Sequence, residues 1–167
     1  MLPLVCSSSH VLFFSLLQHI RFVVPNPPKI PLTALEDGSE RAWFDIMANK
    51  YSESDEEDYP GIRKAMYRLH DLIHEEADAL GKLYAPEGTD PLEARKIGAQ
   101  RIIVGGFGQG GALALFSGIR YPHKLGGMVS FSGYFPHVQE TAEAMELARQ
   151  GKDEDGNECT CLWIHEI

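Results

Sequence analysis

A glycine-rich turn lies between a short apolar run and a helical pattern in this 167-residue chain. The run Arg101-Ile102-Ile103-Val104 is typical of a strand buried on both faces of a parallel sheet. The turn Gly105–Gly111 follows at once. A helix is predicted after it, because apolar residues recur at helical spacing until Pro122. A strand that turns directly into a helix predicts an α/β fold with parallel strands and right-handed crossovers.

One interpretation of the turn is a nucleophile elbow, the sharp bend that lifts a catalytic serine clear of a sheet. Gly108 then occupies the apex, where the serine would stand. Gly106 and Gly110 flank the apex, where side chains are expected to collide with neighbouring backbone. The backbone N–H of Gln109 is the candidate donor to an oxyanion.

Two other interpretations fit the same glycines. Gly106, Gly108 and Gly111 match the dinucleotide-binding pattern Gly-x-Gly-x-x-Gly between a strand and a helix. However, Gly110 would be superfluous in that pattern, and residues 126–132 hold no acidic residue to bind a ribose. The turn could also be a tight connection without chemistry.

Four further segments are distinctive: His19–Pro28, Trp43–Ile46, Leu125–Gly133 and Leu162–His165. Together with the turn, they resemble the acyl-protein thioesterase and lysophospholipase-like branch of the phospholipase/carboxylesterase family of α/β-hydrolases. The resemblance implies a partial α/β-hydrolase fold, in which a parallel sheet carries helices on both faces and His19–Val24 forms an early strand. It also implies that the partners are acylated proteins or lipid esters.

The chain departs from the family's pattern at the residues of the reaction. The family's order is Ser, Asp, His, and Gly108 replaces the serine. Met1–Leu17 shows no His-Gly-Leu-Gly-Asp-type loop, which supplies the family's second oxyanion donor. His165 matches the end of a family strand, and the sequence given stops two residues later, before the family's Asp and His. We therefore expect an atypical segment at 1–18, an incomplete domain at 19–167 lacking outer elements at both ends, and no intact catalytic residue.

Other serines are candidates to replace the missing nucleophile. Ser117 falls inside the helix after the turn, and Ser130 and Ser132 fall on the next strand or at its end. A serine needs an adjacent base to attack at neutral pH. No histidine has a motif-based claim to that role, and Ser132 matches a structural Ser-Gly of the family.

Composition limits the range of partners. The net charge of −9 argues against nucleic acid and anionic membrane surfaces. The apolar stretch Val11–Leu17 is too short for an integral membrane span, which takes about 20 residues. Cys6, Cys159 and Cys161 form neither a disulfide framework nor a zinc set, so a cytoplasmic location fits best. No cofactor is predicted.

An amphipathic helix is predicted from Ile62, with an apolar stripe at Ala65, Met66, Leu69, Leu72, Ile73 and Ala77. His70 and His74 on this helix imitate a zinc-protease motif, but aspartate replaces its glutamate, and we expect two surface histidines and no metal site.

Asp90 is a predicted helix cap with Glu93 reaching back to it, within a Gly81–Ala99 stretch that resembles an insertion.

Three hypotheses about function remain open from the sequence. The chain could hydrolyse acyl thioesters or esters, as the family does. It could instead bind an acyl group or a lipidated protein without catalysis. It could finally be a fragment or gene-model artefact without independent activity. The missing serine favours an inactive chain.

Overall fold

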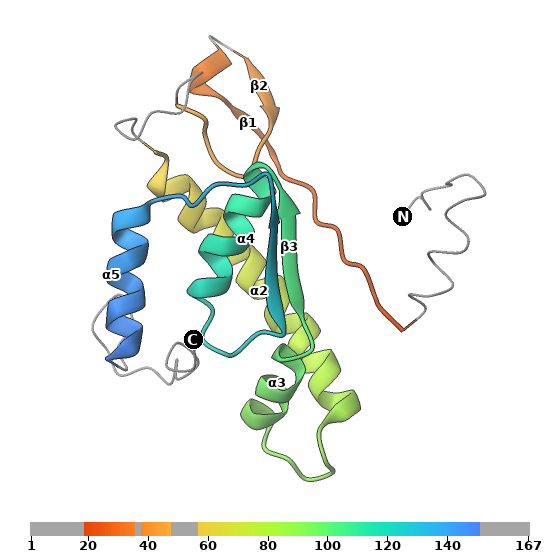
Figure 1. The fold of residues 1–167 in the computed structure, drawn as a ribbon. Helices are drawn as coiled ribbons and strands as arrows, with labels where there is room; N and C mark the ends of the chain where they lie inside the picture. Colours follow the sequence, from red (N-terminus) through yellow and green to blue (C-terminus); the bar gives the residue numbers. More distant parts are fainter. Residues whose placement is uncertain (1–18, 36–37, 48–56, 151–167) are drawn as a thin grey trace, which may run out of the picture.

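The computed structural model of the chain describes residues 19–35, 38–47 and 57–150. The described elements follow one another as β1 (Lys29–Pro31), η1 (Thr33–Leu35), β2 (Ser39–Arg41), α2 (Tyr59–Tyr84), α3 (Pro91–Ala99), β3 (Ile103–Phe107), α4 (Gln109–Ile119), β4 (Gly127–Phe131) and α5 (Val138–Arg149) (Figure 1). Strands β1 and β2 pair antiparallel in a small sheet of their own. The predictions for 1–18, for the cysteines and for His165 lie outside the described residues.

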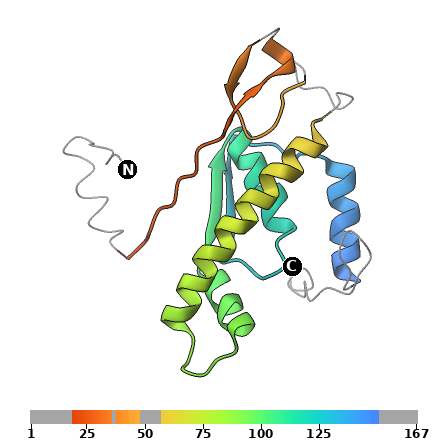
Figure 2. The same ribbon diagram turned by 180° about the vertical axis from the view of Figure 1, so that it is seen from behind.

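The centre of the fold is a β3–α4–β4 unit. Strands β3 and β4 are parallel, with Ile103 opposite Gly127 and Phe107 opposite Phe131. Helix α4 connects the two strands and packs on both, and α2 lies against α4 (Figure 2). The predicted α/β class with parallel strands is confirmed.

The β3–β4 sheet is buried on one face and open on the other. Val104 is buried beneath the helices, whereas Ile103 and Phe107 are 67% and 75% exposed. The prediction of a strand buried on both faces is therefore correct for one face only. The strand also begins two residues later than predicted, because Arg101 and Ile102 make turn hydrogen bonds back to the end of α3.

The strand predicted at His19–Val24 does not form in the described structure. Residues 19–28 run as an extended, mostly exposed segment into β1 (Figure 1). A salt bridge of 3.0 Å from Arg21 to Glu76 ties this segment to α2. A strand requires a neighbour for its backbone hydrogen bonds, and no described strand pairs with these residues.

Helix α2 supplies most of one wall of the core. The predicted stripe is confirmed: Ala65, Met66, Ile73 and Ala77 are buried, and Leu69 packs against both clusters of the core. One cluster joins α2 to α4 through Phe116 and Leu113, together with Phe44. The other joins α2, α3, β3 and α4.

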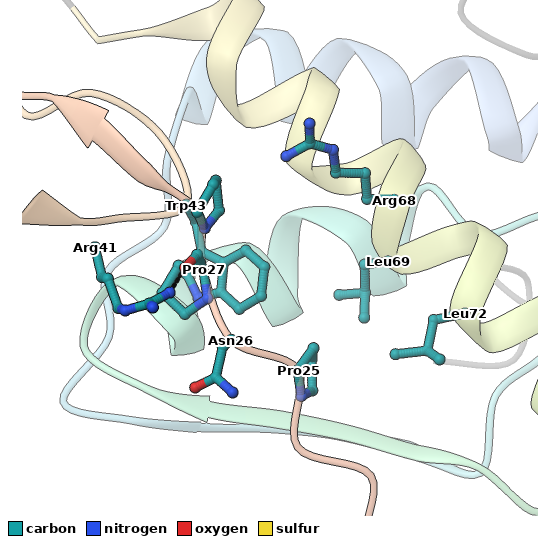
Figure 3. Close-up of a pocket in the computed structure, with 9 residues that line it drawn as sticks. Pro25, Asn26, Pro27, Arg41, Trp43, Arg68, Leu69 and Leu72 are labelled. Carbon is teal, nitrogen blue, oxygen red and sulfur yellow. Dashed lines mark hydrogen bonds between the residues drawn. The ribbon is translucent and has the colours of Figure 1, made fainter. Parts of the chain in front are cut away.

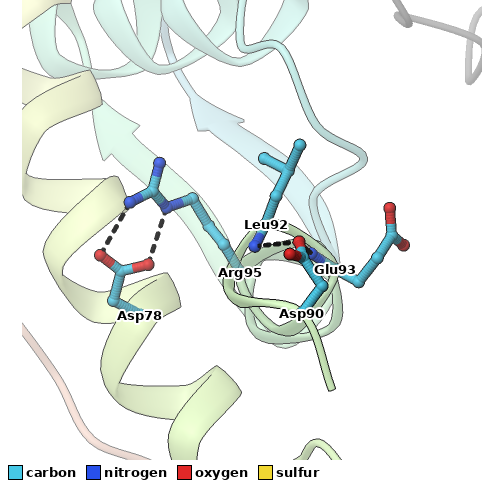
Figure 4. Close-up of polar contacts among 5 residues, drawn as sticks. All are labelled: Asp78, Asp90, Leu92, Glu93 and Arg95. Carbon is cyan, nitrogen blue, oxygen red and sulfur yellow. Dashed lines mark hydrogen bonds and ion pairs between the residues drawn. The ribbon is translucent and has the colours of Figure 1, made fainter. Parts of the chain in front are cut away.

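Helix α3 packs closely on α2, and the two form the hairpin that includes the Gly81–Ala99 stretch. A side chain on Gly81 would overlap the backbone of Ala94, so this crossing requires glycine. Asp78 accepts two hydrogen bonds from Arg95, at 2.7 and 3.0 Å (Figure 4). The carboxylate pairing lowers the pKa of Asp78, since the guanidinium favours its ionised form.

The helix cap predicted at Asp90 is confirmed, because its carboxylate accepts from the N–H groups of Leu92 and Glu93 (Figure 4). The expected return contact of Glu93 is absent among the described hydrogen bonds. Its carboxylate instead lies 2.6 Å from Lys96 Nζ, one turn along α3.

Three histidines surround the ring of Tyr121. The centroids of His70 and His74 each lie 5.2 Å from the Tyr121 centroid, and that of His123 lies 5.8 Å away. His70 is buried and its Nε2 donates to the Ser117 carbonyl at 2.8 Å, so the expectation of a surface histidine is wrong for this residue. Burial lowers the pKa of all three imidazoles and raises the pKa of Tyr121 to about 12.

Acidification should destabilise this fold. The pKa values of His70, His74 and His123 lie below the ordinary value of 6.5 in the folded state. As the pH falls, the unfolded chain therefore binds more protons than the folded chain does. The stability that these three neutral histidines contribute is complete above pH 6.5 and is lost progressively below that pH. Urea unfolding at a series of pH values from about 7.5 to about 5 measures this slope.

The matched variant is His70→Gln, which keeps an N–H for the Ser117 carbonyl but does not titrate. We expect the free energy of unfolding to depend less steeply on pH in this variant than in the parent chain. Equal slopes in His70→Gln and the parent chain would contradict the prediction.

Candidate functional site

The turn between β3 and α4 holds its apex in a left-handed conformation. Gly108 has φ 54° and ψ −121°, and it is the N-cap of α4 without a side-chain hydrogen bond. Its N–H donates to the Phe131 carbonyl at 2.9 Å, which joins the apex to the end of β4. This backbone turns sharply from strand into helix, as the sequence predicts for a nucleophile elbow, and it has no side chain at its apex.

The glycines around the apex differ in their steric need. A Cβ on Gly106 would overlap the carbonyl of Gly110, so a side chain there has no room. A Cβ on Gly111 would lie 2.5 Å from Ser130 Oγ and 2.9 Å from the Gly106 oxygen. On Gly110 it would meet only Trp43 Nε1, at an ordinary 3.7 Å. The collision expected at Gly110 thus falls on Gly111 instead.

The side chain of Gln109 has a role that the sequence did not reveal. Its Oε1 accepts from the Trp43 N–H at 2.9 Å, and its Nε2 donates to the Phe44 carbonyl at 2.8 Å. The amide thus satisfies both backbone groups as a neighbouring strand would. A glutamine in the first turn of an apolar, glycine-rich helix was the available signal. Its backbone N–H, the candidate oxyanion donor, is among the first N–H groups of α4 and lacks an acceptor within the helix.

The Trp43–Asp45 segment is fixed at its far end as well. The Asp45 carboxylate accepts from Thr33 N at 2.8 Å and from Thr33 Oγ1 at 2.5 Å. The Asp45 N–H donates to the Asp58 carboxylate at 2.8 Å, and the same carboxylate caps α2 by accepting from Gly61 N. The segment therefore connects η1, α2 and α4.

The candidate replacement serines do not form a catalytic arrangement with the described histidines. Ser117 and Ser130 have buried hydroxyls without a hydrogen-bond partner among the described residues. Ser132 is exposed at the end of β4 and has a positive φ of 49°. His137 is buried, and its backbone N–H and its Nδ1 lie 2.6 and 3.5 Å from the Glu57 carboxylate.

Metal-binding and membrane-spanning features are absent from the described part of the chain. No three or more His, Cys, Asp or Glu side chains there are grouped so that they could hold a metal ion. Over the same residues, no helix is long and apolar enough to cross a membrane.

The profile of a family described as phospholipase/carboxylesterase matches residues 8–151. The chain belongs to this family. The chain is 33% identical over 136 residues to acyl-protein thioesterase 1 of Schizosaccharomyces pombe, covering 81% of this chain and 52% of that protein. It is 37% identical over 120 residues to acyl-protein thioesterase 1 of Mycosarcoma maydis, covering 72% and 46%.

Solved structures of related proteins also match the fold of this chain. A variant of Arabidopsis thaliana SOBER1 superposes with a TM-score of 0.61 at 26% identity, covering 79% of this chain and 54% of that one. The chain spans about half the length of the curated relatives it matches. The elbow and the Trp43–Asp45 segment both fall within the residues that match the family.

The steric difference between the elbow glycines predicts unequal effects of alanine. Gly106→Ala should destabilise the fold by about 3 kcal/mol or prevent folding, because the new methyl group overlaps fixed backbone. Gly110→Ala should change stability by no more than about 1 kcal/mol, since the new methyl group makes only an ordinary contact with Trp43 and alanine favours a helix. Chemical denaturation measures both, and equal losses would contradict the steric assignment.

The two hydrogen bonds of the Gln109 side chain to Trp43 and Phe44 predict a second loss of stability. Gln109→Ala leaves the Trp43 N–H and the Phe44 carbonyl without their partners, at a cost of about 1–3 kcal/mol. Gln139→Ala on the exposed side of α5 is the matched control, expected within about 0.5 kcal/mol of the parent. A Gln109→Ala variant as stable as the control would show that the bridge does not stabilise the fold.

Proposed function

We propose that this chain is a non-hydrolysing member of the phospholipase/carboxylesterase family. The observation that carries the proposal is Gly108 at the apex of the elbow, with φ 54°. The backbone has the bend that presents a nucleophile, but glycine has no atom that can attack a carbonyl. Loss of a triad member reduces the rate of such enzymes by several orders of magnitude.

The positions of the described histidines support the same proposal. His70, His74 and His123 gather around Tyr121, and His137 contacts Glu57. Tyr121 follows the C-terminal end of α4, at the opposite end of that helix from Gly108. An adjacent base is the second requirement for a serine nucleophile, so a hydroxyl at position 108 alone would not restore the reaction.

The class of partner follows from the relatives, which are named acyl-protein thioesterases. We propose that the chain retains affinity for an acylated protein or a lipid ester without cleaving it. A cytoplasmic location is the proposal that accords with a sequence of three cysteines and no disulfide framework.

Gly108→Ser tests the proposal together with the parent chain. A Cβ at this position would have nothing within 4 Å, so the only penalty is the left-handed backbone, on the order of 1–3 kcal/mol. Gly108→Ala carries the same penalty without a hydroxyl and is the matched control. We expect both variants to lose similar stability, and we expect neither variant nor parent to hydrolyse p-nitrophenyl butyrate or a palmitoyl thioester above the buffer rate.

Two results would contradict the proposal, and each would point to a different residue as its cause. Turnover by the parent chain that a fluorophosphonate abolishes would show a nucleophile elsewhere. Turnover gained in Gly108→Ser but not in Gly108→Ala would show that a base stands beside the elbow.

A further inference from the structure

The open face of the β3–β4 sheet carries large apolar side chains at one end and a gap at the other. Phe107 and Phe131 lie opposite each other in the strand register, and they are 75% and 63% exposed. At the amino ends of the same strands, Ile103 lies opposite Gly127, which has no side chain. Figure 1 shows α4 along one side of the two strands and no described helix beside the other. The face is therefore raised at one end and hollow at the other.

The open face is uncharged, although the chain is strongly acidic. The net charge of the chain is −9, whereas neither β3 nor β4 contains a charged residue. Two copies with this net charge repel each other, and the repulsion is smallest where they approach through an uncharged surface. An exposed apolar patch of this kind is typical of a surface that contacts another protein.

The exposed area of this face limits how tightly a partner can bind. Taking about 200 Å² for a phenylalanine side chain, Phe107 and Phe131 together offer about 280 Å². Ile103 and Val129, which are 67% and 39% exposed, raise the total to about 400 Å² per copy. Two such faces bury about 800 Å², below the range of about 1,200–2,000 Å² for stable interfaces. Contact between two copies is therefore expected to be weak and reversible.

A pocket beside the extended segment is a different kind of apolar surface. Its volume is about 310 Å³, and it lies between residues 25–28, Trp43 and the α2 side chains Leu69 and Leu72 (Figure 3). Two arginines also line it, and no residue of β3 or β4 does. A concave, partly charged site of this size suits a small molecule, whereas a flat sheet face suits another sheet. The two surfaces are thus separate, and the sheet face is the one suited to a second copy.

We propose that two copies of this chain form a weak dimer in which the open sheet faces pack together with their strands antiparallel. A two-fold axis that crosses the strands places Phe107 of each copy over Ile103 of the other. The same axis places Phe131 over Gly127, so the ring fills the gap that glycine leaves. Packed sheets lie about 10 Å apart, and large side chains opposite small ones fill this space. A parallel arrangement would set phenylalanine against phenylalanine and leave the Gly127 ends apart.

Sedimentation velocity of the full chain tests the association directly. Between about 5 and about 300 μM we expect a shift from monomer to dimer, with a Kd in the micromolar range. Raising the NaCl concentration from about 0.05 to about 0.5 M should tighten the dimer, because salt screens the repulsion between two acidic copies. A parent chain that stays monomeric over this range would overturn the proposal and would leave the face to another occupant. A dimer that salt weakens would reject this uncharged face as its interface.

Ile103→Lys and Phe107→Glu test the geometry of the contact. Each substitution alone should weaken self-association at least about tenfold, because it places an unpaired charge in the interface. An equal mixture of the two variants should associate again, because the two-fold axis brings the introduced ammonium beside the introduced carboxylate. Val129→Asp is a further variant on the same face, away from the turn. Position 129 meets itself across the axis, so two like charges should prevent its dimerisation.

Leu83→Lys is the matched control for a new charge on an exposed apolar residue. Leu83 lies on α2 and is 70% exposed, close to the 67% of Ile103. This variant should dimerise as the parent does, and circular dichroism and thermal unfolding check that every variant is folded. Equal weakening by Leu83→Lys and Ile103→Lys would reject the proposed face. A mixture of folded Ile103→Lys and Phe107→Glu chains that stays monomeric would reject the antiparallel geometry.

Discussion

The side-chain amide of Gln109 connects the turn after β3 to residues that precede it by 66 and 65 positions in the sequence. It pairs with the N–H of Trp43 and the carbonyl of Phe44, so the turn after β3 and the segment before α2 are fixed together. Phe44 then packs into the core with Ile62 and Phe116, and Asp45 reaches η1 and the cap of α2. The turn at Gly108 is thus the point from which helix α2 and the small β1–β2 sheet are positioned.

Local sequence signals were sufficient where local physics decides the structure. The apolar stripe of α2, the cap at Asp90 and the sharp turn at Gly108 depend on helical spacing, a side-chain acceptor and a left-handed backbone. Non-local features were harder to predict. The strand expected at His19–Val24 depends on a neighbouring strand, and the burial of His70 depends on the Ser117 carbonyl, 47 residues away. The sequence could not show either partner.

The β3–β4 pair is stabilised from one side. Val104 and Met128 share the face toward α4, while Ile103, Phe107 and Phe131 share the open one. Parallel strands usually have helices on both faces, because every apolar side chain that leaves water contributes to stability. With one face exposed, the pair depends on α4 and on the hydrogen bond from the Gly108 N–H to the Phe131 carbonyl. The same turn therefore holds the sheet together and would present a nucleophile in a hydrolase.

These two roles of the turn are physically separable. Holding the sheet requires the bend itself, which glycine adopts at little cost, whereas a serine must be forced into it. Catalysis would require the strained serine, a base and an oxyanion site at the same time. Gly108 meets the first requirement without strain and meets none of the second. A chain with glycine at this position can keep the architecture of its family, because the apex contributes only backbone contacts, such as the N–H that donates to the Phe131 carbonyl, which any residue in this conformation could make. The other contacts of the bend come from Gly106, Gln109 and Gly111.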